Sequence, residues 1–329
     1  MKILVTGGTG FLGSHLVELL VKKDIQVKCL VRDTINLKWL KGMPVELFRG
    51  DCSESDSLGL AVSGVDYVFH LAGLVRAVRQ EDLYNANVIG TRNLLEAIVS
   101  KNPSIKKFIY VSSQAASGPA PFDGVLTENS DAAPVSNYGY SKLLGEYEVM
   151  KFKDKFPVTI LRPPAIYGPR DKDIFMFFKA AHSGLLPVPA VDKILNISYA
   201  GDIANAVFSA SETSATDGNT YFIGDDAPVL FSGFCRLLAQ IINKKAKIVK
   251  VPEWGVWLSA LLGEFVQNAT RKPSLSSLDK YRELKQTRWL FSSAKAKSDF
   301  GYKTEVSLEA GIKNTYEWYV KNGWLKRKQ

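Results

Sequence analysis

The first half of the chain alternates short apolar runs with segments whose apolar residues recur every three or four positions. Consecutive apolar residues are typical of strands covered on both faces, and the longer period is typical of helices. Their alternation predicts a parallel sheet with right-handed crossovers. The expected strands are Ile3–Thr6, Gln26–Arg32, Val45–Phe48, Tyr67–Leu71, Phe108–Ser112 and Val158–Arg162, and the expected helices are Phe11–Lys23, Glu54–Val62, Asn85–Ser100 and Tyr138–Asp154.

The pattern becomes irregular after Arg162, where prolines interrupt the apolar runs. We therefore expect an α/β fold with a Rossmann-type doubly wound parallel sheet in residues 1–165 and a segment near 195–223 that returns to it. Residues 166–329 are expected to form a smaller, mostly helical substrate lobe, interleaved with the first domain. Its expected elements are helices over Ile174–Ser183, Asp202–Ser211 and Leu308–Asn322, and a strand over Thr220–Ile223.

Composition adds limits on the cellular setting and on metals. The chain has 329 residues, of which 46% are hydrophobic and 23% charged, the balance of a globular protein with a sizeable core. Its three cysteines are scattered, and an odd count suits a reducing compartment, so we expect a cytoplasmic protein. Neither the cysteines nor the three histidines have metal-ligand spacing, and no metal site is expected.

The formal net charge of +9 has two interpretations. One is attraction to nucleic acid or to an anionic membrane, and the other is a solvated basic surface that also attracts an anionic cofactor. Because lysines are spread along the whole chain, we favour the second and expect no nucleic-acid partner. No apolar run reaches the roughly 18 residues of a spanning helix, so no integral membrane segment is expected.

Glycines at positions 7, 10 and 13 lie directly after the first expected strand and at the start of the first expected helix. A tight turn needs a residue without Cβ, and a pyrophosphate must approach the backbone closely at the N–H groups of a helix N-terminus. In this strand–turn–helix context the glycines predict a dinucleotide-binding turn.

The end of the second strand distinguishes the two nicotinamide dinucleotides. NAD-binding proteins place an acidic residue there to bind the ribose 2′-hydroxyl, whereas arginine suits the 2′-phosphate of NADP. Val31 occupies the acidic position and Arg32 follows it, which favours NADP(H). NAD(H) remains possible, because Asp33 would serve if the register moved by two residues.

Tyr138 and Lys142 are four residues apart and therefore share one face of a helix. The ordinary pKa of tyrosine is near 10, and a neighbouring ammonium and an oxidised nicotinamide would both lower it. Ser112 and Ser113 end the fifth expected strand, where a second hydroxyl is available to hold a substrate oxygen. This arrangement predicts hydride transfer assisted by Tyr138, Lys142 and a serine.

With these motifs the chain resembles the extended short-chain dehydrogenase/reductase group, also called the NAD-dependent epimerase/dehydratase superfamily. The matching motifs extend over most of the chain. They are Thr6 to Gly13, Gly50-Asp51, His70-Leu71-Ala72-Gly73, Asn87 to Thr91, Val111-Ser112-Ser113, Tyr138-Gly139-Tyr140-Ser141-Lys142 and Leu161 to Pro169.

The resemblance implies a role for each matching residue. Ser113, Tyr138 and Lys142 would be catalytic. Asp51 and Cys52 would lie beside the adenine, and Pro163 and Pro164 would pack against the nicotinamide. The expected cofactor contacts together are Gly7, Thr9, Gly10, Phe11, Leu12, Gly13, Arg32, Asp51, Cys52, Leu71, Ala72, Gly73, Asn87, Ser112, Tyr138, Lys142, Pro163, Pro164 and Ile166.

Two departures separate the chain from nucleotide-sugar enzymes of this group. Those enzymes often carry an arginine where this chain reads Ile194-Leu195-Asn196, and their dehydratases carry an acidic pair after the serine, where this chain has Gln114 and Ala115. Arg32, the double proline and the C-terminal segment from Leu308 look more like the dihydroflavonol-4-reductase and 3β-hydroxysteroid dehydrogenase-like branch.

The function expected from this resemblance is an NADP(H)-dependent oxidoreductase that reduces a ketone or aldehyde, or oxidises the alcohol, of a largely apolar small molecule. A nucleotide-sugar 4-epimerase or dehydratase with a tightly bound NAD(P) is one alternative. A non-catalytic NADP-binding regulatory protein is another, since fold alone does not fix function. Relatives often dimerise through helices of the sheet domain, so a homodimer is possible.

Two features on the substrate side have open interpretations. Apolar residues at helical spacing from Trp254 to Phe265 predict either core packing of the lobe, which we favour, or a lid or membrane-surface helix. Arg76, Arg79 and Arg170 are expected in loops near the cleft. They would either bind an anionic substrate group or remain solvated.

Overall fold

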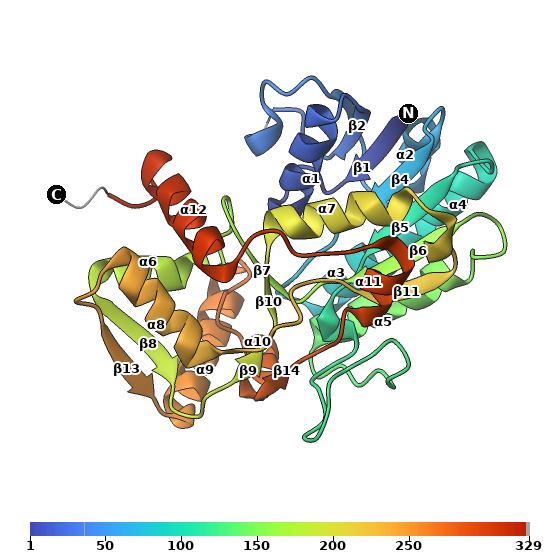
Figure 1. The fold of residues 1–329 in the computed structure, drawn as a ribbon. Coiled ribbons are helices and arrows are strands. Elements are labelled where there is room, and N and C mark those ends of the chain that lie inside the picture. Colours follow the sequence, from blue (N-terminus) through green and yellow to red (C-terminus); the bar gives the residue numbers. More distant parts are fainter. Residues whose placement is uncertain (36, 327–329) are drawn as a thin grey trace.

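A seven-stranded parallel sheet lies at the centre of the sheet domain in this computed structural model, which describes residues 1–35 and 37–326 (Figure 1). Its strand order is β11-β6-β5-β4-β1-β2-β3, so the order reverses between β1 and β4. The predicted Rossmann-type doubly wound fold is confirmed. The strands are β1 (Lys2–Thr6), β2 (Gln26–Val31), β3 (Glu46–Arg49), β4 (Tyr67–His70), β5 (Lys107–Val111), β6 (Val158–Arg162) and β11 (Asn219–Phe222).

Helices cover both faces of the sheet because alternate side chains of each strand point to opposite sides. Ile3 and Val5 of β1 belong to the hydrophobic core of one face, whereas Leu4 between them belongs to the other. The first core is closed by α1 (Phe11–Lys22), α7 (Ala200–Ser211) and α11 (Ala294–Phe300), and the second by α2 (Ser55–Val62), α4 (Gly90–Lys101) and α5 (Asn137–Met150). The returning strand β11 and helix α11 both come from beyond residue 165.

The helix expected over Asn85–Ser100 begins earlier than predicted. A short helix α3 (Gln80–Tyr84) continues through a π-helical turn (Asn85–Ile89) into α4. Glu81 and Asp82 lie in the first turn of α3, where carboxylates favour a helix N-terminus, so a start signal was present in the sequence. The π turn changes the helical register near Asn87 and is the kind of irregularity often found at functional sites.

The smaller lobe packs α6 (Phe175–Ser183), α8 (Phe231–Ile242) and α12 (Leu308–Lys321) around a second hydrophobic core. It also contains short strands that the sequence pattern did not predict. Strands of two to five residues are too short to show an alternating pattern, and prolines interrupt β8. They are β7 (Ala165–Tyr167), β8 (Leu185–Pro189), β9 (Ile194–Leu195), β10 (Ile197–Tyr199), β12 (Val229–Leu230), β13 (Lys247–Val251) and β14 (Arg288–Trp289).

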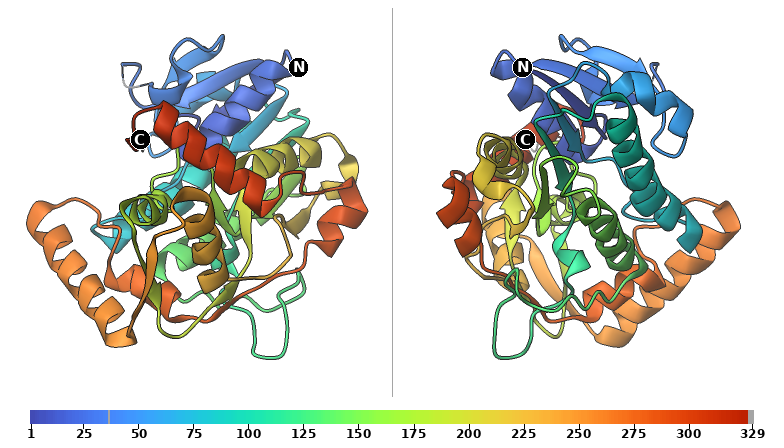
Figure 2. Two further views of the ribbon diagram at one scale, coloured as in Figure 1. Left: turned by 60° about the vertical axis from the view of Figure 1, so that its left-hand side comes forward. Right: turned by 90° about the vertical axis from the view of Figure 1, so that its right-hand side faces the viewer.

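The prediction that the aromatic segment from Trp254 to Phe265 packs in the core of the lobe is wrong. This segment forms α9 (Glu253–Thr270), which lies at the periphery of the molecule in both views of Figure 2 and is followed by α10 (Leu278–Lys285). The large apolar side chains of α9 are exposed, and its buried residues are Ala260 and Gln267. Helical periodicity identified the element but not which side of it faces the protein.

The part of the chain that the structure describes has no candidate for a membrane-spanning helix and none for a metal site. None of its helices is long and apolar enough to cross a bilayer. Among the same residues, no three His, Cys, Asp or Glu side chains are placed to hold a metal ion.

Candidate active site

The glycine-rich turn lies at the carboxyl ends of β1 and β4, where the strand order reverses. Gly7 has φ of +74°, and a Cβ there would lie 2.7 Å from the backbone nitrogen of Ala72. A Cβ on Gly13 would lie 2.2 Å from the carbonyl oxygen of Gly7. The turn is therefore packed against its own backbone and against the segment after β4, and only glycine fits at these two positions.

The N-terminus of α1 faces outward from this turn without a side chain to cap it. Gly10 is the N-cap residue, and Thr9, Phe11 and Leu12 surround it at intermediate exposure. In the described structure the first turn of α1 has no acidic residue. Free N–H groups and the positive end of the helix dipole fit a pyrophosphate, so the cradle suits a dinucleotide.

The residues expected near the adenosine lie at the ends of β2 and β3. The β2 strand ends at Val31, and the Arg32 side chain that follows is 77% exposed, with its Nε 3.9 Å from a carboxylate oxygen of Asp51. Asp51 also accepts hydrogen bonds from the backbone and hydroxyl of Ser53. Cys52 is buried, and burial raises the pKa of its thiol to about 12, so it is present as a neutral thiol.

The segment after β4 connects the turn to α5. The backbone N–H of Leu71 and that of Ala72 bond to the carbonyl and the hydroxyl of Thr6. A Cβ on Gly73 would lie 2.7 Å from Oδ1 of Asn87 and 4.0 Å from Nζ of Lys142. The glycine turn, Gly73, Asn87 and Lys142 are thus brought together, as the sequence motifs require.

A buried histidine, not predicted as functional, fixes this edge of the sheet. Nδ1 of His70 lies 2.6 Å from the Thr6 hydroxyl, and Nε2 lies 3.0 Å from the Thr91 hydroxyl. Burial lowers the pKa of His70 to about 3, so the ring is neutral at physiological pH. His70 therefore links β1, β4 and α4 as an uncharged hydrogen-bonding group.

Lys142 projects from α5 into the interior. Its Nζ donates to the carbonyl oxygen of Val111 at 2.8 Å and lies 4.1 Å from the centre of the Tyr110 ring. Burial lowers the pKa of Lys142 to about 7, and the nearby carboxylate of Glu146 opposes that fall. A buried ammonium with this pKa changes charge near neutral pH.

Tyr138 and Ser113 approach each other through their hydroxyls. Ser113 follows the end of β5 and accepts a hydrogen bond from the backbone of Ala115. Burial raises the pKa of Tyr138 to about 12, the hydrogen bond with Ser113 opposes the rise, and the charges of Glu283 and Asp173 add to it. In the protein alone, burial outweighs the hydrogen bond with Ser113, so the net shift of the Tyr138 pKa is upward. The expected lowering by an oxidised nicotinamide stays a prediction.

An ion pair that the sequence did not predict lies between α5 and β6. Glu146 is one helical turn beyond Lys142, and its carboxylate is held by Arg162 of β6 at 2.6 and 2.9 Å. The hydroxyl of Ser112, expected to contact the cofactor, donates to the same carboxylate. Tyr138, Lys142 and Glu146 recur every four residues, so the helical spacing already placed Glu146 on the same face of α5 as the other two.

A second missed contact holds the start of α5. Asp279 of α10 accepts from the backbone N–H of Asn137 at 2.7 Å and from that of Tyr138 at 3.4 Å. Glu283, one turn further along α10, accepts from the hydroxyl of Ser136. Helix α10 therefore supplies carboxylates to the N-terminus of α5, which a helix dipole favours.

Pro163 and Pro164 are buried after β6, and Ile166 follows in β7, beside β10. The carbonyl of Pro163 accepts from the backbone of Gln114, next to Ser113. This bond places the double proline beside Ser113, on the side of the site where the nicotinamide is expected.

The three arginines expected near the cleft have acidic partners within the chain. Arg76 pairs with Asp173, Arg79 with Asp82, and Arg170 with Glu18 of α1. Because these charges are already neutralised, the structure gives no support to their binding an anionic substrate group.

Comparisons with known proteins place the chain in one family. The model of the NAD dependent epimerase/dehydratase family matches residues 3–224. The chain is 30% identical to a ceramide reductase of Caulobacter vibrioides (strain NA1000 / CB15N), over 99% of this chain and 96% of that protein. It is 28% identical to a 3 beta-hydroxysteroid dehydrogenase/Delta 5-->4-isomerase of monkeypox virus, over 95% of this chain and 97% of that protein.

Solved structures agree over the whole length. A protein described as gox2253 superposes with a TM-score of 0.80 at 27% identity, covering 99% of both chains. A UDP-glucuronic acid 4-epimerase from Bacillus cereus in complex with NAD shares the fold, with a TM-score of 0.79 at 23% identity over 99% of this chain and all of that one. The resemblance to the extended short-chain dehydrogenases/reductases is confirmed, as is an NAD(P)-dependent enzyme. The chain belongs to the NAD dependent epimerase/dehydratase family.

Proposed function

We propose that this enzyme is an NADP(H)-dependent carbonyl reductase acting on a largely apolar ketone or aldehyde, or on the alcohol in the reverse direction. The observation that carries the proposal is the pairing of the Tyr138 and Ser113 hydroxyls, with Lys142 one helical turn away beside Gly73. This pairing lies at the carboxyl ends of β4 and β5, next to the glycine cradle.

Each side chain has a distinct role in the proposed reaction. The bound dinucleotide supplies the hydride. The Ser113 hydroxyl holds the substrate oxygen, and Tyr138 donates a proton from its Oη to that oxygen. Because the pKa of Tyr138 is raised to about 12, the phenol is protonated at neutral pH, the state that reduction needs.

Lys142 holds the cofactor side of the site. Its Nζ has one carbonyl partner, Val111, which leaves N–H groups to bind ribose hydroxyls. Binding of an electron-rich ligand favours the protonated form of Lys142. The positive charge of Lys142 then stabilises the negative charge that develops on the substrate oxygen. The buried ion pair of Glu146 and Arg162 lies one helical turn from Lys142 and positions it.

The preference for NADP(H) rests on Arg32. Its exposed side chain directly follows β2, the position from which arginine reaches a ribose 2′-phosphate. Asp51 is near enough to pair with Arg32 and to orient it. NAD(H) remains the alternative, because solved relatives include NAD complexes.

The substrate class follows from two observations. Relatives of similar length are named as a ceramide reductase and as sterol and steroid dehydrogenases, which act on large apolar molecules. The absence of an arginine at Ile194-Leu195-Asn196 and the neutralised Arg76, Arg79 and Arg170 disfavour a diphosphate substrate. We also propose that the chain divides into a sheet domain of residues 1–165 and a substrate lobe, and that it forms a homodimer.

The test is NADPH consumption with a panel of long-chain and polycyclic ketones and aldehydes. Tyr138→Phe is expected to lower kcat/KM by about a thousandfold while NADPH binding, followed by fluorescence, is unchanged. Tyr140→Phe, an exposed neighbour on the same helix, is the matched control and is expected to keep full activity. Arg32→Gln is expected to weaken NADPH about tenfold and NADH little.

Two results would contradict the proposal. Turnover of UDP-sugars without added cofactor would identify an epimerase with resident NAD(P). Unchanged activity of Tyr138→Phe on every substrate would remove the catalytic role of the phenol, and no turnover of any substrate by the wild type would favour a binding protein.

A further inference from the structure

Helix α9 carries its large apolar side chains on the side that faces solvent. They recur at positions three and four apart, so they form one stripe along the helix. Trp254, Leu262 and Phe265 are 69%, 58% and 73% exposed. Trp257, Leu258 and Leu261 between them are also exposed. A continuous apolar stripe of this kind marks an interaction site, because monomeric surfaces seldom carry one.

The opposite side of α9 fixes the helix in this orientation. Ala260 and Gln267 are buried, and a Cβ on Gly263 would lie 1.7 Å from the carbonyl oxygen of Ser276. Gln267 accepts from the backbone N–H of Ser274. The small and polar side of the helix is therefore packed against the protein, and rotation cannot bury the tryptophans without losing these contacts.

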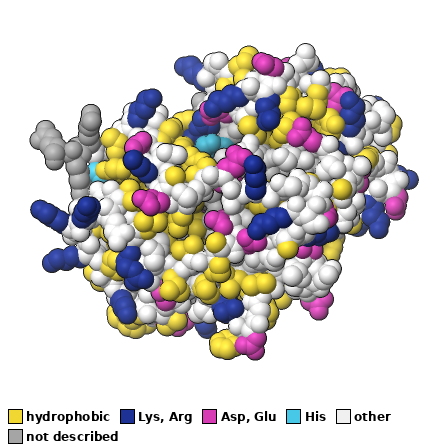
Figure 3. Space-filling view, in the orientation of Figure 1, with side chains coloured by type: hydrophobic (Ala, Val, Ile, Leu, Met, Phe, Trp, Pro, Cys, Tyr) yellow, Lys and Arg dark blue, Asp and Glu magenta, His cyan; other side chains and the backbone are white. Residues whose placement is uncertain are grey.

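Basic side chains come both before and after α9 along the chain. Lys244, Lys245, Lys247 and Lys250 precede α9, and Arg271 and Lys272 follow it; all are exposed. Lys and Arg gather on the edge of the lobe where β13 lies (Figure 3). The acidic residues of α9 are already engaged, because Glu253 accepts from the Tyr281 hydroxyl and Glu264 from the backbone N–H of Leu278.

We propose that α9 and its flanking lysines bind the surface of an anionic lipid bilayer, with the apolar stripe inserted among the acyl chains. An amphipathic helix lies in the interface when one face is apolar and cations lie beside it, and tryptophan is favoured at that depth. A second copy of the chain is disfavoured as the occupant, since it would bring two sets of lysines together. The proposal concerns a surface outside the catalytic site and does not depend on the substrate.

The test is flotation of the full-length protein with vesicles of phosphatidylcholine alone or with one third phosphatidylglycerol. Trp254→Gln, Leu262→Gln and Phe265→Gln combined are expected to weaken binding about a hundredfold or more. Lys244, Lys245, Lys247 and Lys250 replaced by Gln are expected to weaken it by a similar factor, and only on anionic vesicles.

Matched controls separate this surface from general stickiness. Ile35→Gln, Leu60→Gln and Phe122→Gln remove exposed apolar side chains of other elements and are expected to leave flotation unchanged. NADPH binding and the melting temperature of every variant check that it is folded. These readouts stay intact if the proposed reductase activity fails, so the two proposals are tested separately.

Three results would overturn the membrane proposal. The first is no flotation with either vesicle. The second is equal flotation of the wild type and the stripe variant. The third is a stripe variant that turns a dimer into a monomer, by analytical ultracentrifugation, while the wild type never binds vesicles; that result would assign the stripe to a second copy.

Discussion

Strand β5 has a buried lysine at each end, and the two lysines are held in different ways. Lys107 begins the strand, and Lys142 reaches from α5 to the carbonyl of Val111 at its other end. Both side chains are almost completely buried. A buried lysine therefore lies at the end of β5 away from the expected cofactor site, and another lies at the end next to that site.

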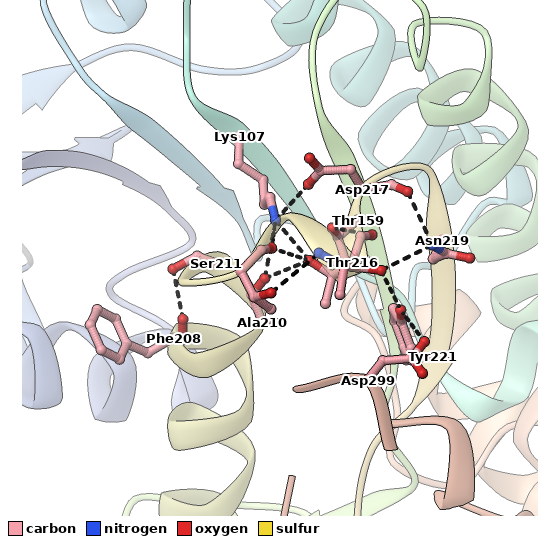
Figure 4. Close-up of polar contacts among 12 residues, drawn as sticks. Lys107, Thr159, Phe208, Ala210, Ser211, Thr216, Asp217, Asn219, Tyr221 and Asp299 are labelled. Carbon is pink, nitrogen blue, oxygen red and sulfur yellow. Dashed lines mark hydrogen bonds and ion pairs between the residues drawn. The ribbon is translucent and has the colours of Figure 1, made fainter. Parts of the chain in front are cut away.

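Lys107 is surrounded by acceptors from the returning segment (Figure 4). Its Nζ donates to the Thr216 hydroxyl at 2.7 Å and pairs with the Asp217 carboxylate at 2.6 Å. The carbonyls of Ala210 and Thr213 are further acceptors. All three N–H groups of this ammonium are used within the fold, which ties β5 to α7 and to the turn before β11.

Lys142 has far fewer hydrogen-bond partners than Lys107. Within the described residues, the one hydrogen-bond acceptor of its Nζ is the Val111 carbonyl, and the ring of Tyr110 lies below it. The nearest carboxylate, Glu146, is engaged by Arg162. A buried ammonium with unused N–H groups is costly to the fold and available to a ligand, and this contrast supports the proposed functional role of Lys142 and a structural role for Lys107.

Replacing Lys142 with methionine is expected to give the largest effect of the comparison. The catalytic site loses its cation, and kcat/KM is expected to fall by about a thousandfold. Near pH 7 the free energy of unfolding is expected to stay the same or to rise, because a poorly paired buried ammonium is costly to the fold. Steady-state kinetics and urea unfolding measure the two quantities on one preparation.

The matched variant Lys107→Met is expected to lose stability and to keep its activity. Asp217 and three oxygen acceptors lose their donor, which is expected to lower the free energy of unfolding by about 3 kcal/mol, less than for a fully buried pair because Asp217 is one third exposed. At temperatures where the variant is folded, kcat/KM is expected to stay within about twofold. A large kinetic loss in Lys107→Met, or a large stability loss in Lys142→Met, would break the distinction.

Much of the fold could be predicted because each strand of the sheet is a short, almost entirely apolar run next to a helix of clear period. Val158–Arg162 was predicted residue for residue, and most other boundaries in the sheet domain moved by a residue or two. The helix expected over Tyr138–Asp154 ends earlier, at Met150, and the helix expected from Asn85 begins at Gln80. The strands of the lobe could not be found in this way, since β9, β12 and β14 have two residues each. The direction in which α9 faces is a tertiary property: Gly263 and Gln267 pack where the period alone favoured tryptophan.

In the candidate site, too, features within one element were predicted and contacts between elements were not. Spacing within one element placed Tyr138 and Lys142 together, and the glycine turn needed only its local context. Contacts between elements were not visible: Arg162 with Glu146, or Asp279 at the start of α5, join residues separated by 16 and 142 positions. The direction of the pKa of Tyr138 also depended on burial, which the sequence does not give.

The final prediction uses pH to compare Lys142 with its own uncharged variant. The ordinary pKa of lysine is 10.5, and burial lowers that of Lys142 to about 7 in the folded protein. Between these values the unfolded chain binds a proton at Lys142 that the folded chain does not bind. Raising the pH through this window therefore favours the folded state, at most by about 1.4 kcal/mol per pH unit.

Urea unfolding of wild type and Lys142→Met across this window isolates the effect, because other titrating groups cancel in the difference. The free energy of unfolding of the wild type is expected to rise relative to that of Lys142→Met as the pH increases from about 7 toward 10.5. Lys107→Met, compared with wild type in the same way, serves as the reference for a lysine whose N–H groups are all used. Parallel pH curves for wild type and Lys142→Met would show that Lys142 keeps its charge in the folded protein, and the contrast between the two ends of β5 would then lie in geometry alone.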